Sequence, residues 1–560
     1  MCGIVGITSQ SPVINRTLLV SMRDTLRHRG PDDAGVWWSQ DERVGLAQQR
    51  LAIIDLSPGG HQPMADSSGQ LSLIFNGEIY NYQSLRRELE ALGHRFRTAS
   101  DSEVILEAYK AWGLECVKRL NGMFAFGLYD NTTRRLFMAR DRAGEKPLFY
   151  YHTTGTLVFA SELKAIMTDP SFPRKLNLEA LDYYLTYGYV PGEMCILKGV
   201  RKLLPAHAMT YDPEGDDLRV WRYWQLPEPC RSETASEEAL AEELEYLLMD
   251  SVRLRLIADV PVGILLSGGV DSSLVTAMAA RVSTKPVKTF TISFPGHGAY
   301  DESPYARLVA QHFGTEHTEL VADAATVDLL PELARQYDEP MADSSMVPTY
   351  LVSRLIRQHA TVALGGDGGD ELFGGYPHYS WLQRAEHLRR FVPGSLRSWA
   401  GAVAARAMPV GMKGRNYLIG FADGLSLSIA HVNMFFDTQA RLQLLSPWLR
   451  NKMPSESSPE SYKAGLCSNG KTALQQATVI DFITYLVDDI LVKVDRASML
   501  TSLEVRAPWL DHRIIELAFG RVPDALRATE KELKILPRHL ARRLLPSELD
   551  LNRKQGFSLP

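Results

Sequence analysis

The chain has few cysteines and little excess charge for its length. Its five cysteines, Cys2, Cys116, Cys195, Cys230 and Cys467, lie far apart among 560 residues and form no Cys-x-x-Cys pair. That spacing excludes a zinc ribbon and a disulfide framework, and it predicts a reducing, cytoplasmic setting. A formal net charge of −5 argues against partners that are nucleic acids or anionic membranes.

Long apolar segments and internal repeats are also missing. No run of about 18 apolar residues occurs, and no basic-then-apolar leader precedes the chain, so we expect neither a membrane span nor a signal peptide. An apolar fraction of 45% still supports large cores. At roughly 100–200 residues per domain, a chain of this length predicts at least two domains.

The two halves of the chain differ in their hydrophobic pattern. Up to about residue 200, short apolar runs such as 71–75 and 124–129 end at turn signals and predict strands, with helices at 84–92 and 102–112. We therefore expect an α+β domain at 2–204, with antiparallel sheets between helices. Pro-rich and charged sequence at 205–236 predicts a linker.

The second half, 237–560, alternates helical stretches with short apolar runs. Helical pattern at 239–255 and 481–498 is interleaved with runs at 262–266, 289–293 and 361–364. Such alternation predicts a mostly parallel sheet wrapped by helices, which makes the whole chain a two-domain α/β protein.

The second residue is the first candidate for chemistry. If Met1 were removed, Cys2 would carry both a thiol and a free α-amine, whose reference pKa lies near 8. That amine can accept the thiol proton, and only a thiolate attacks a carbonyl carbon. The alternative for Cys2 is a small buried hydrophobe.

A phosphate-binding loop is predicted at 267–273. Gly268 and Gly269 let the backbone approach a polyanion, and a helix expected from Leu274 to Arg281 presents free N–H groups, so Ser267 to Ser272 are candidate phosphate contacts. No Gly-Lys-Ser/Thr ending follows, which excludes a Walker loop. Asp271 inside the loop indicates a Mg²⁺ ligand. A capped Gly-Ser turn is the alternative.

A second glycine-rich loop at 365–376 carries three carboxylates. Six glycines in this span, Gly365 and Gly366 among them, indicate that a ligand approaches the backbone. Asp367, Asp370 and Glu371 would repel one another without a cation, so Mg²⁺ shared with a nucleotide pyrophosphate is the simplest explanation. A flexible surface loop is the alternative.

Six segments occur in one order across the chain: 2–4 (Cys-Gly-Ile), 50–57, 75–81, 100–103, 267–273 and 495–499. Together they resemble glutamine-hydrolysing asparagine synthetases over nearly the whole length. The resemblance implies an N-terminal-nucleophile glutaminase joined to an adenine-nucleotide α-hydrolase-like synthetase domain. It also implies ATP and Mg²⁺ as cofactors, small-molecule substrates and a homodimer.

The resemblance assigns roles in the first half. Cys2 would attack the side-chain amide of glutamine and release ammonia from a thioester, with Asn76 and the backbone N–H of Gly77 as the oxyanion hole. Donors fixed where negative charge develops contribute about 3–4 kcal/mol each.

Glutamine itself would be held by three charged residues in the resemblance. Arg50 matches the residue that grips its α-carboxylate, and Glu78 and Asp101 match those that hold its α-ammonium. A planar guanidinium suits a carboxylate, and a carboxylate suits an ammonium.

In the second half the resemblance implies an acyl-adenylate. Asp271 and Asp370 would be the Mg²⁺ ligands, Lys554 would neutralise charge near the α-phosphate, and Leu265 and Ile292 would contact adenine unless they are plain core residues. Ammonia would then attack the adenylate. Because water protonates ammonia, we expect a dry passage between the domains.

One position departs from well-studied relatives. They carry Glu where this chain has Asp367, so the acid that deprotonates ammonia is shorter by one methylene. The acceptor is therefore either aspartate or another carboxylate, such as a sugar acid or a natural-product acid.

A ring-closing β-lactam synthetase-like role is opposed by the intact glutaminase residues, and a scaffold role by the retention of Cys2 and Asp271. We also expect a tail beyond Pro560.

Overall fold

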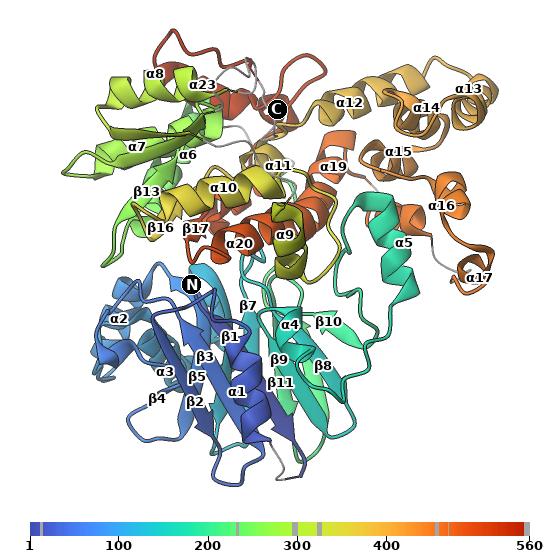
Figure 1. Cartoon of the computed structure of the whole chain (residues 1–560). Coiled ribbons are helices and arrows are strands. Elements are labelled where there is room, and N and C mark those ends of the chain that lie inside the picture. The colour runs from blue at the N-terminus through green and yellow to red at the C-terminus, as the bar shows by residue number, and fades with distance from the viewer. Residues whose placement is uncertain are drawn as a thin grey trace.

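The computed structural model describes residues 1–11, 15–230, 235–293, 301–321, 328–453, 458–468 and 470–553 (Figure 1). The N-terminal half, blue to teal, forms one body and the C-terminal half, green to red, forms a second body above it (Figure 1). The N-terminus lies where the two bodies meet (Figure 1).

The N-terminal body is built on two six-stranded antiparallel sheets. The first has the order β10-β8-β9-β1-β3-β2 and the second β12-β11-β7-β6-β5-β4. The strands of the first sheet are β1 (Gly3–Ser9), β2 (Asp33–Trp38), β3 (Val44–Arg50), β8 (Phe149–Thr153), β9 (Thr156–Ala160) and β10 (Val200–Lys202). Those of the second are β4 (Met64–Ala65), β5 (Leu71–Ile79), β6 (Gly122–Asp130), β7 (Arg135–Arg140), β11 (His207–Asp212) and β12 (Asp217–Arg222).

Helices cover the outer faces of both sheets. The helix α1 (Arg16–Asp24) packs on β1 and β3, whereas α3 (Asp101–Trp112) packs on β5 and against α2 (Tyr82–Ala91). The inner faces meet in a buried core that includes Ile4, Ile74 and Phe159. This arrangement confirms the predicted sandwich of antiparallel sheets between helices. Short helices α4 (Leu163–Ile166) and α5 (Leu178–Tyr187) lie between β9 and β10 in the chain.

The expected linker at 205–236 begins too early. Residues 207–222 form β11 and β12, and β11 pairs with β7 through Ala208↔Ala139. The turn between the two strands contains Pro213, Glu214 and Gly215, and this local composition mimics a linker although β11 is buried at Ala208, Met209 and Tyr211.

The C-terminal body contains a five-stranded parallel sheet of order β15-β14-β13-β16-β17. Its strands are β13 (Val262–Leu265), β14 (Lys288–Ser293), β15 (Glu316–Val321), β16 (Val362–Leu364) and β17 (Glu504–Arg506). The chain moves outward in one direction from β13 and in the other from β16. The carboxyl ends of β13 and β16 therefore flank a topological switch point, where ligands bind in open α/β sheets.

Helices surround this sheet on both faces, as predicted. They are α6 (Glu237–Arg255), α7 (Val270–Val282), α8 (Ser303–Phe313), α9 (Leu329–Tyr337), α10 (Met346–Ile356), α11 (Gly369–Phe373), α21 (His512–Gly520), α22 (Asp524–Arg527) and α23 (Ile535–Leu544). A peripheral group comprises α12 (Pro377–Arg389), α13 (Gly394–Ala407), α14 (Arg415–Ala422), α15 (Leu425–Val432), α16 (Thr438–Leu444), α17 (Pro447–Arg450) and α18 (Pro459–Gly465). No helix among the described residues is long and apolar enough to span a bilayer.

A long helix runs between the two bodies. The stretch expected as one helix at 481–498 consists of the end of α19 (Ala473–Asp481), a π-helical segment η4 (Phe482–Ile490) and α20 (Leu491–Met499). In the π-helical segment the backbone hydrogen bonds span five residues, which changes the direction of its side chains relative to an α-helix. Such segments are frequent at functional sites.

Candidate active sites

The first site forms at the start of β1. Because Gly3 pairs with Gln49, the end of β3 brings Arg50 beside Cys2. The Cys2 side chain is buried, and its backbone N–H donates to Asn76 Oδ1 over 2.9 Å. Burial raises the pKa of the Cys2 thiol, while the N-terminal ammonium and the Arg50 guanidinium partly oppose that shift. The thiol therefore needs a base to become a nucleophile.

Two donors lie on β5 next to this thiol. The Asn76 side-chain nitrogen, Nδ2, is buried and has no hydrogen-bond partner among the described residues. Gly77 has a φ of 152°, and a Cβ there would lie 2.0 Å from the Met123 carbonyl oxygen, so only glycine fits. An unsatisfied buried donor costs free energy unless a ligand completes it. Asn76 and Gly77 thus have the chemistry of an oxyanion hole.

Three charged residues enclose the space around these donors. Arg50 Nη2 donates to the carbonyl oxygen of Asp55 over 2.6 Å, and the missing Cβ of Gly60 leaves room for its guanidinium, since a Cβ would approach Nη2 to 1.9 Å. Glu78 Oε2 is buried and has no hydrogen-bond partner within the described part of the chain, whereas Asp101 accepts the Ile79 N–H over 2.8 Å. Arg50 thus lies close enough to act on the Cys2 thiol electrostatically, and Asp101 close enough to act on Glu78.

The two carboxyl groups of this pocket titrate unusually. Burial raises the pKa of Glu78, and the neighbouring Asp101 and Glu504 carboxylates add to the shift. Burial likewise raises the pKa of Asp101 to about 6. A cation held between these carboxylates would restore their ordinary ionisation, so the pocket favours a cationic ligand.

The second site is a cleft of about 540 Å³ at the switch point of the parallel sheet. All the predicted ATP-binding residues line it: Leu265, Ser267, Gly268, Gly269, Asp271, Ser272, Ile292, Gly365 and Gly366. Gly269 precedes the first residue of α7, so the amino end of that helix points its free N–H groups at the cleft. A cleft of this size accommodates a nucleotide and a small acid.

The two predicted metal ligands converge on one lysine. Lys534 Nζ contacts Asp271 Oδ2 and lies 2.8 Å from Asp370 Oδ1. Burial alone would lower the pKa of Lys534, but the two carboxylates outweigh burial and raise it. Carboxylate oxygens gathered around one positive charge fit the donor preference of Mg²⁺. No group of three or more His, Cys, Asp or Glu among the described residues forms a metal site, so phosphate oxygens would have to complete the shell.

Lys534 was not predicted from the sequence. It lies in the charged stretch 530–534, which has the composition of a solvated turn, and its left-handed φ of 52° turns it into the cleft. Lys554, which was predicted, lies outside the described residues.

A second group of charged residues lines the far end of the cleft. Lys493, from α20, lies 3.0 Å from Asp343 Oδ2, and Ser345 donates to the other oxygen of Asp343. Burial raises the pKa of Asp367, and Lys493 partly opposes the shift. Asp367, within the glycine-rich loop, therefore has a carboxyl of raised proton affinity, and its role as general base stays a prediction.

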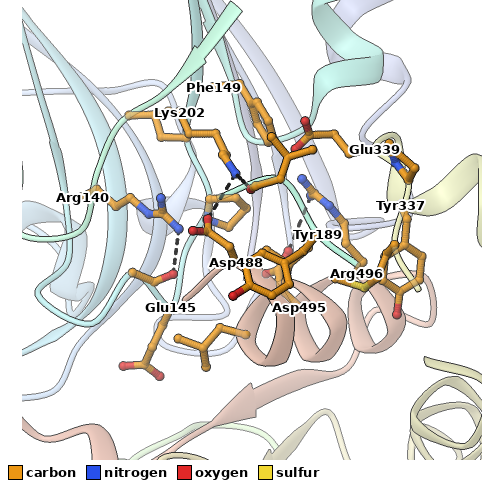
Figure 2. A pocket seen from close by; sticks show the side chains of 18 residues that line it. Arg140, Glu145, Phe149, Tyr189, Lys202, Tyr337, Glu339, Asp488, Asp495 and Arg496 are labelled. Carbon is orange, nitrogen blue, oxygen red and sulfur yellow. Dashed lines mark hydrogen bonds and ion pairs between the residues drawn. The ribbon is translucent and has the colours of Figure 1, made fainter. Parts of the chain in front are cut away.

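A small cavity separates the two sites. It measures about 30 Å³ and is lined by apolar side chains and by charged groups from both bodies (Figure 2). Lys202 lies 3.1 Å from Asp488, and Arg496 faces Asp495 (Figure 2). Burial raises the pKa of Glu145, in the same wall, to about 8. The cavity has room for one or two molecules of the size of water, and ion pairs surround it.

Arg29 connects this cavity to the thiol. Its Nε donates to the Cys2 carbonyl over 3.0 Å, and its two Nη atoms bind the Asp495 carboxylate over 2.8 Å each. A further contact joins Arg29 Nη1 to Glu162 over 2.7 Å. A bidentate pair of this kind fixes geometry strongly, so β1 and α20 are held in register across the interface.

Comparisons with known proteins match both halves of the chain. The family model "Asparagine synthase" matches residues 243–560, and "Glutamine amidotransferase domain" matches residues 1–224. The chain is 33% identical over 565 residues to asparagine synthetase [glutamine-hydrolyzing] 1 of Bacillus subtilis, covering 100% of this chain and 87% of that protein. It is 32% identical over 590 residues to asparagine synthetase [glutamine-hydrolyzing] 3 of the same organism, with coverage of 100% and 87%. It is also 29% identical to amidase chry2 of Gibberella zeae, over 94% of this chain and 83% of that protein.

The fold, the paired sites and these matches define the class. The chain is an ATP-dependent carbon–nitrogen ligase that takes its nitrogen from glutamine. More particularly, it belongs to the asparagine synthase family.

Proposed function

We propose that the protein makes asparagine from aspartate, with ATP and glutamine as co-substrates. The observation that carries the proposal is the contact of buried Cys2 with Asn76, whose Nδ2 has no hydrogen-bond partner among the described residues. The other domain contains a cleft lined by the glycine-rich loops. The names of the Bacillus relatives support aspartate as the acceptor.

In the first step the Cys2 sulfur, freed by removal of Met1 and activated by its own α-amine, attacks the amide carbon of glutamine. The carbonyl oxygen becomes an oxyanion that accepts hydrogen bonds from Asn76 and Gly77. The C–N bond breaks, ammonia leaves with the proton taken from sulfur, and water later hydrolyses the γ-glutamyl thioester to glutamate.

In the second step the aspartate side-chain carboxylate attacks the α-phosphorus of ATP. The bond to pyrophosphate breaks, leaving β-aspartyl-AMP and pyrophosphate. Residues 267–272 and the amino end of α7 hold the phosphates, and Mg²⁺, with Asp271 and Asp370 as its protein ligands, would neutralise the pyrophosphate charge. Ammonia then attacks the activated carbonyl, Asp367 takes the surplus proton, and AMP leaves.

Ammonia has to cross from Cys2 to the cleft without meeting bulk water. We place the passage along α20, through the cavity of Figure 2, whose wall includes Val492. Replacing Val492 by Phe should leave glutamine hydrolysis and ammonia-dependent synthesis intact but lower glutamine-dependent synthesis. Val220→Phe, on the exposed strand β12, is the control. If the Val492→Phe variant keeps the wild-type rate in glutamine hydrolysis, in ammonia-dependent synthesis and in glutamine-dependent synthesis, ammonia does not take this route.

A second acceptor is favoured by two observations. Asp367 is one methylene shorter than the Glu that well-studied relatives carry at this position, and amidase chry2 matches over most of this chain. Another carboxylic acid, such as a sugar acid or a natural-product acid, would keep the same two steps. Pyrophosphate release measured with aspartate and with a panel of acids decides between them: no stimulation by aspartate would remove the first proposal. A homodimer and a cytoplasmic location stay predictions.

A further inference from the structure

The synthetase domain reaches into the glutamine pocket through β17. Glu504 and Arg506, at the two ends of this strand, are both 0% exposed. Arg506 Nη2 lies 3.7 Å from Glu78 Oε1, and Arg506 Nε lies 2.7 Å from Glu504 Oε1. A strand of the parallel sheet thus places two charges against a residue that the family resemblance assigns to glutamine binding in the other domain.

The charges gathered there do not balance. Glu78, Asp101 and Glu504 supply three carboxylates, whereas the side chains supply two cations, Arg506 and, near Glu504, Lys146. Glu78 Oε2 and Arg506 Nη2 are buried without hydrogen-bond partners among the described residues. Buried carboxylates in excess of their cations are costly, so a further cation belongs in this space.

An ammonium group occupies that space in this chain. The α-ammonium of Met1 lies 2.7 Å from Glu504 Oε2, and Met1 and Glu504 are almost wholly buried. Burial alone would raise the pKa of Glu504, but the Met1 ammonium and the Arg506 guanidinium lower it. The same ammonium also opposes the upward shift of the Glu78 pKa. A primary ammonium on an α-carbon is the group that glutamine would present.

We propose that Glu504, from the synthetase domain, binds the α-ammonium of glutamine directly, in the place that the Met1 ammonium takes before it is removed. Glu78 and Asp101 face the same group, and Arg506 positions Glu504. The backbone carbonyls of Arg255 and Ile257 fix Arg506 in turn, by accepting from its Nη1 over 2.7 and 2.8 Å. This inference rests on the proposed glutaminase activity. It adds Glu504, a residue of the synthetase domain, to the residues that bind glutamine.

The arrangement joins glutamine binding to the nucleotide cleft. The Arg506 carbonyl accepts the Gly365 N–H over 2.8 Å, and β17 pairs with β16, which leads into the glycine-rich loop. The strand that carries Glu504 therefore also adjoins the glycine-rich loop at 365–376, which lines the nucleotide cleft.

The test compares glutamine with glutaramate, which is glutamine without its α-amino group. For Glu504→Gln, we expect kcat/KM for glutamine hydrolysis to fall about tenfold to a hundredfold, mainly through KM, because a charged hydrogen bond is lost. Hydrolysis of glutaramate should change less than twofold, so the preference for the amino group should collapse. Glu243→Gln, which breaks only a surface ion pair with Arg521, is the matched control.

Three outcomes are distinguishable. Equal losses for glutamine and glutaramate, or an unchanged preference, would overturn the role of Glu504. Wild-type enzyme that hydrolyses neither compound would overturn the proposed function itself. Ammonia-dependent synthesis shows whether a variant folds. If the Glu504→Gln variant does not fold, Glu504→Asp replaces it, because it keeps the charge. For Glu504→Asp, an intermediate preference for glutamine over glutaramate supports the proposal, and a preference equal to that of the wild type contradicts it.

Discussion

The two sites of this molecule differ most in their exposure to water. In the glutamine pocket Cys2, Arg50, Asn76, Glu78 and Asp101 are between 0% and 6% exposed. In the nucleotide cleft the Asp271 and Asp370 side chains are 17% and 26% exposed, in a space of about 540 Å³. A site that releases ammonia gains from excluding water, whereas a site that admits ATP and discharges pyrophosphate has to open.

The largest expected effect separates the sites completely. Cys2→Ala should lower glutamine hydrolysis and glutamine-dependent synthesis by about 10³-fold or more, because the nucleophile is lost. Synthesis from added ammonium should stay within about twofold, because the cleft does not use the thiol. Exposed Cys230→Ala is the control for removing a sulfur. Residual glutamine turnover at the wild-type rate would contradict the assignment.

A second change sharpens the role of the buried donor. Asn76→Asp keeps an oxygen to accept the Cys2 N–H but replaces the Nδ2 donor. We expect kcat for glutamine hydrolysis to fall about 10²- to 10³-fold with a smaller change in KM, the usual loss for one oxyanion donor. Steady-state kinetics with glutamine measures both. A loss confined to KM would show that Asn76 binds substrate and does not stabilise the oxyanion.

The corresponding change in the open site is Asp271→Asn. It removes one carboxylate that faces Lys534 and the predicted Mg²⁺ position, so pyrophosphate release should fall about a hundredfold, as for one lost electrostatic stabiliser. Glutamine hydrolysis without ATP should be unchanged. If raising the Mg²⁺ concentration does not partly restore the rate of the variant, and its affinity for Mg²⁺ equals that of the wild type, Asp271 is not a metal ligand.

The smallest effect concerns pH. The pKa of Asp101 is about 6 and that of Glu78 is also raised, because both are buried. Only the ionised carboxylates bind an ammonium, so affinity for glutamine is full above the raised pKa and declines as pH falls through it. We expect KM for glutamine to rise roughly tenfold per pH unit below about 6. KM for ATP measured over the same range is the comparison, and parallel changes would argue against this cause.

Local patterns predicted most of the elements. Alternation in 71–75 and 124–129 marks β5 and β6, and the glycine-rich loops after β13 and β16 mark the cleft, because strand, turn and helix propensities act over a few residues. The hairpin of β11 and β12 was missed because its turn carries linker-like residues. The predicted ATP-binding residues also line one cleft, whereas the roles assigned to the individual site residues stay predictions.

Contacts made by distant parts of the chain escaped prediction. Lys534 sits in a charged turn, and Glu504 and Arg506 sit in a short strand that follows the 495–499 motif; none has a local signal for its partner. Glu504 lies 503 positions from the Met1 ammonium it contacts, and only the folded arrangement of two domains brings them together. Spacing along a sequence carries no information about such pairs.

The account stands on nitrogen passing internally from the Cys2 pocket to the acid activated in the cleft. In the most direct measurement, the enzyme receives glutamine labelled with heavy nitrogen in its side-chain amide, together with an excess of unlabelled ammonium. Mass spectrometry then determines how much of the amide product carries the label. We predict that most product molecules carry the label. Product labelled only in proportion to the mixed ammonia in solution would contradict the account.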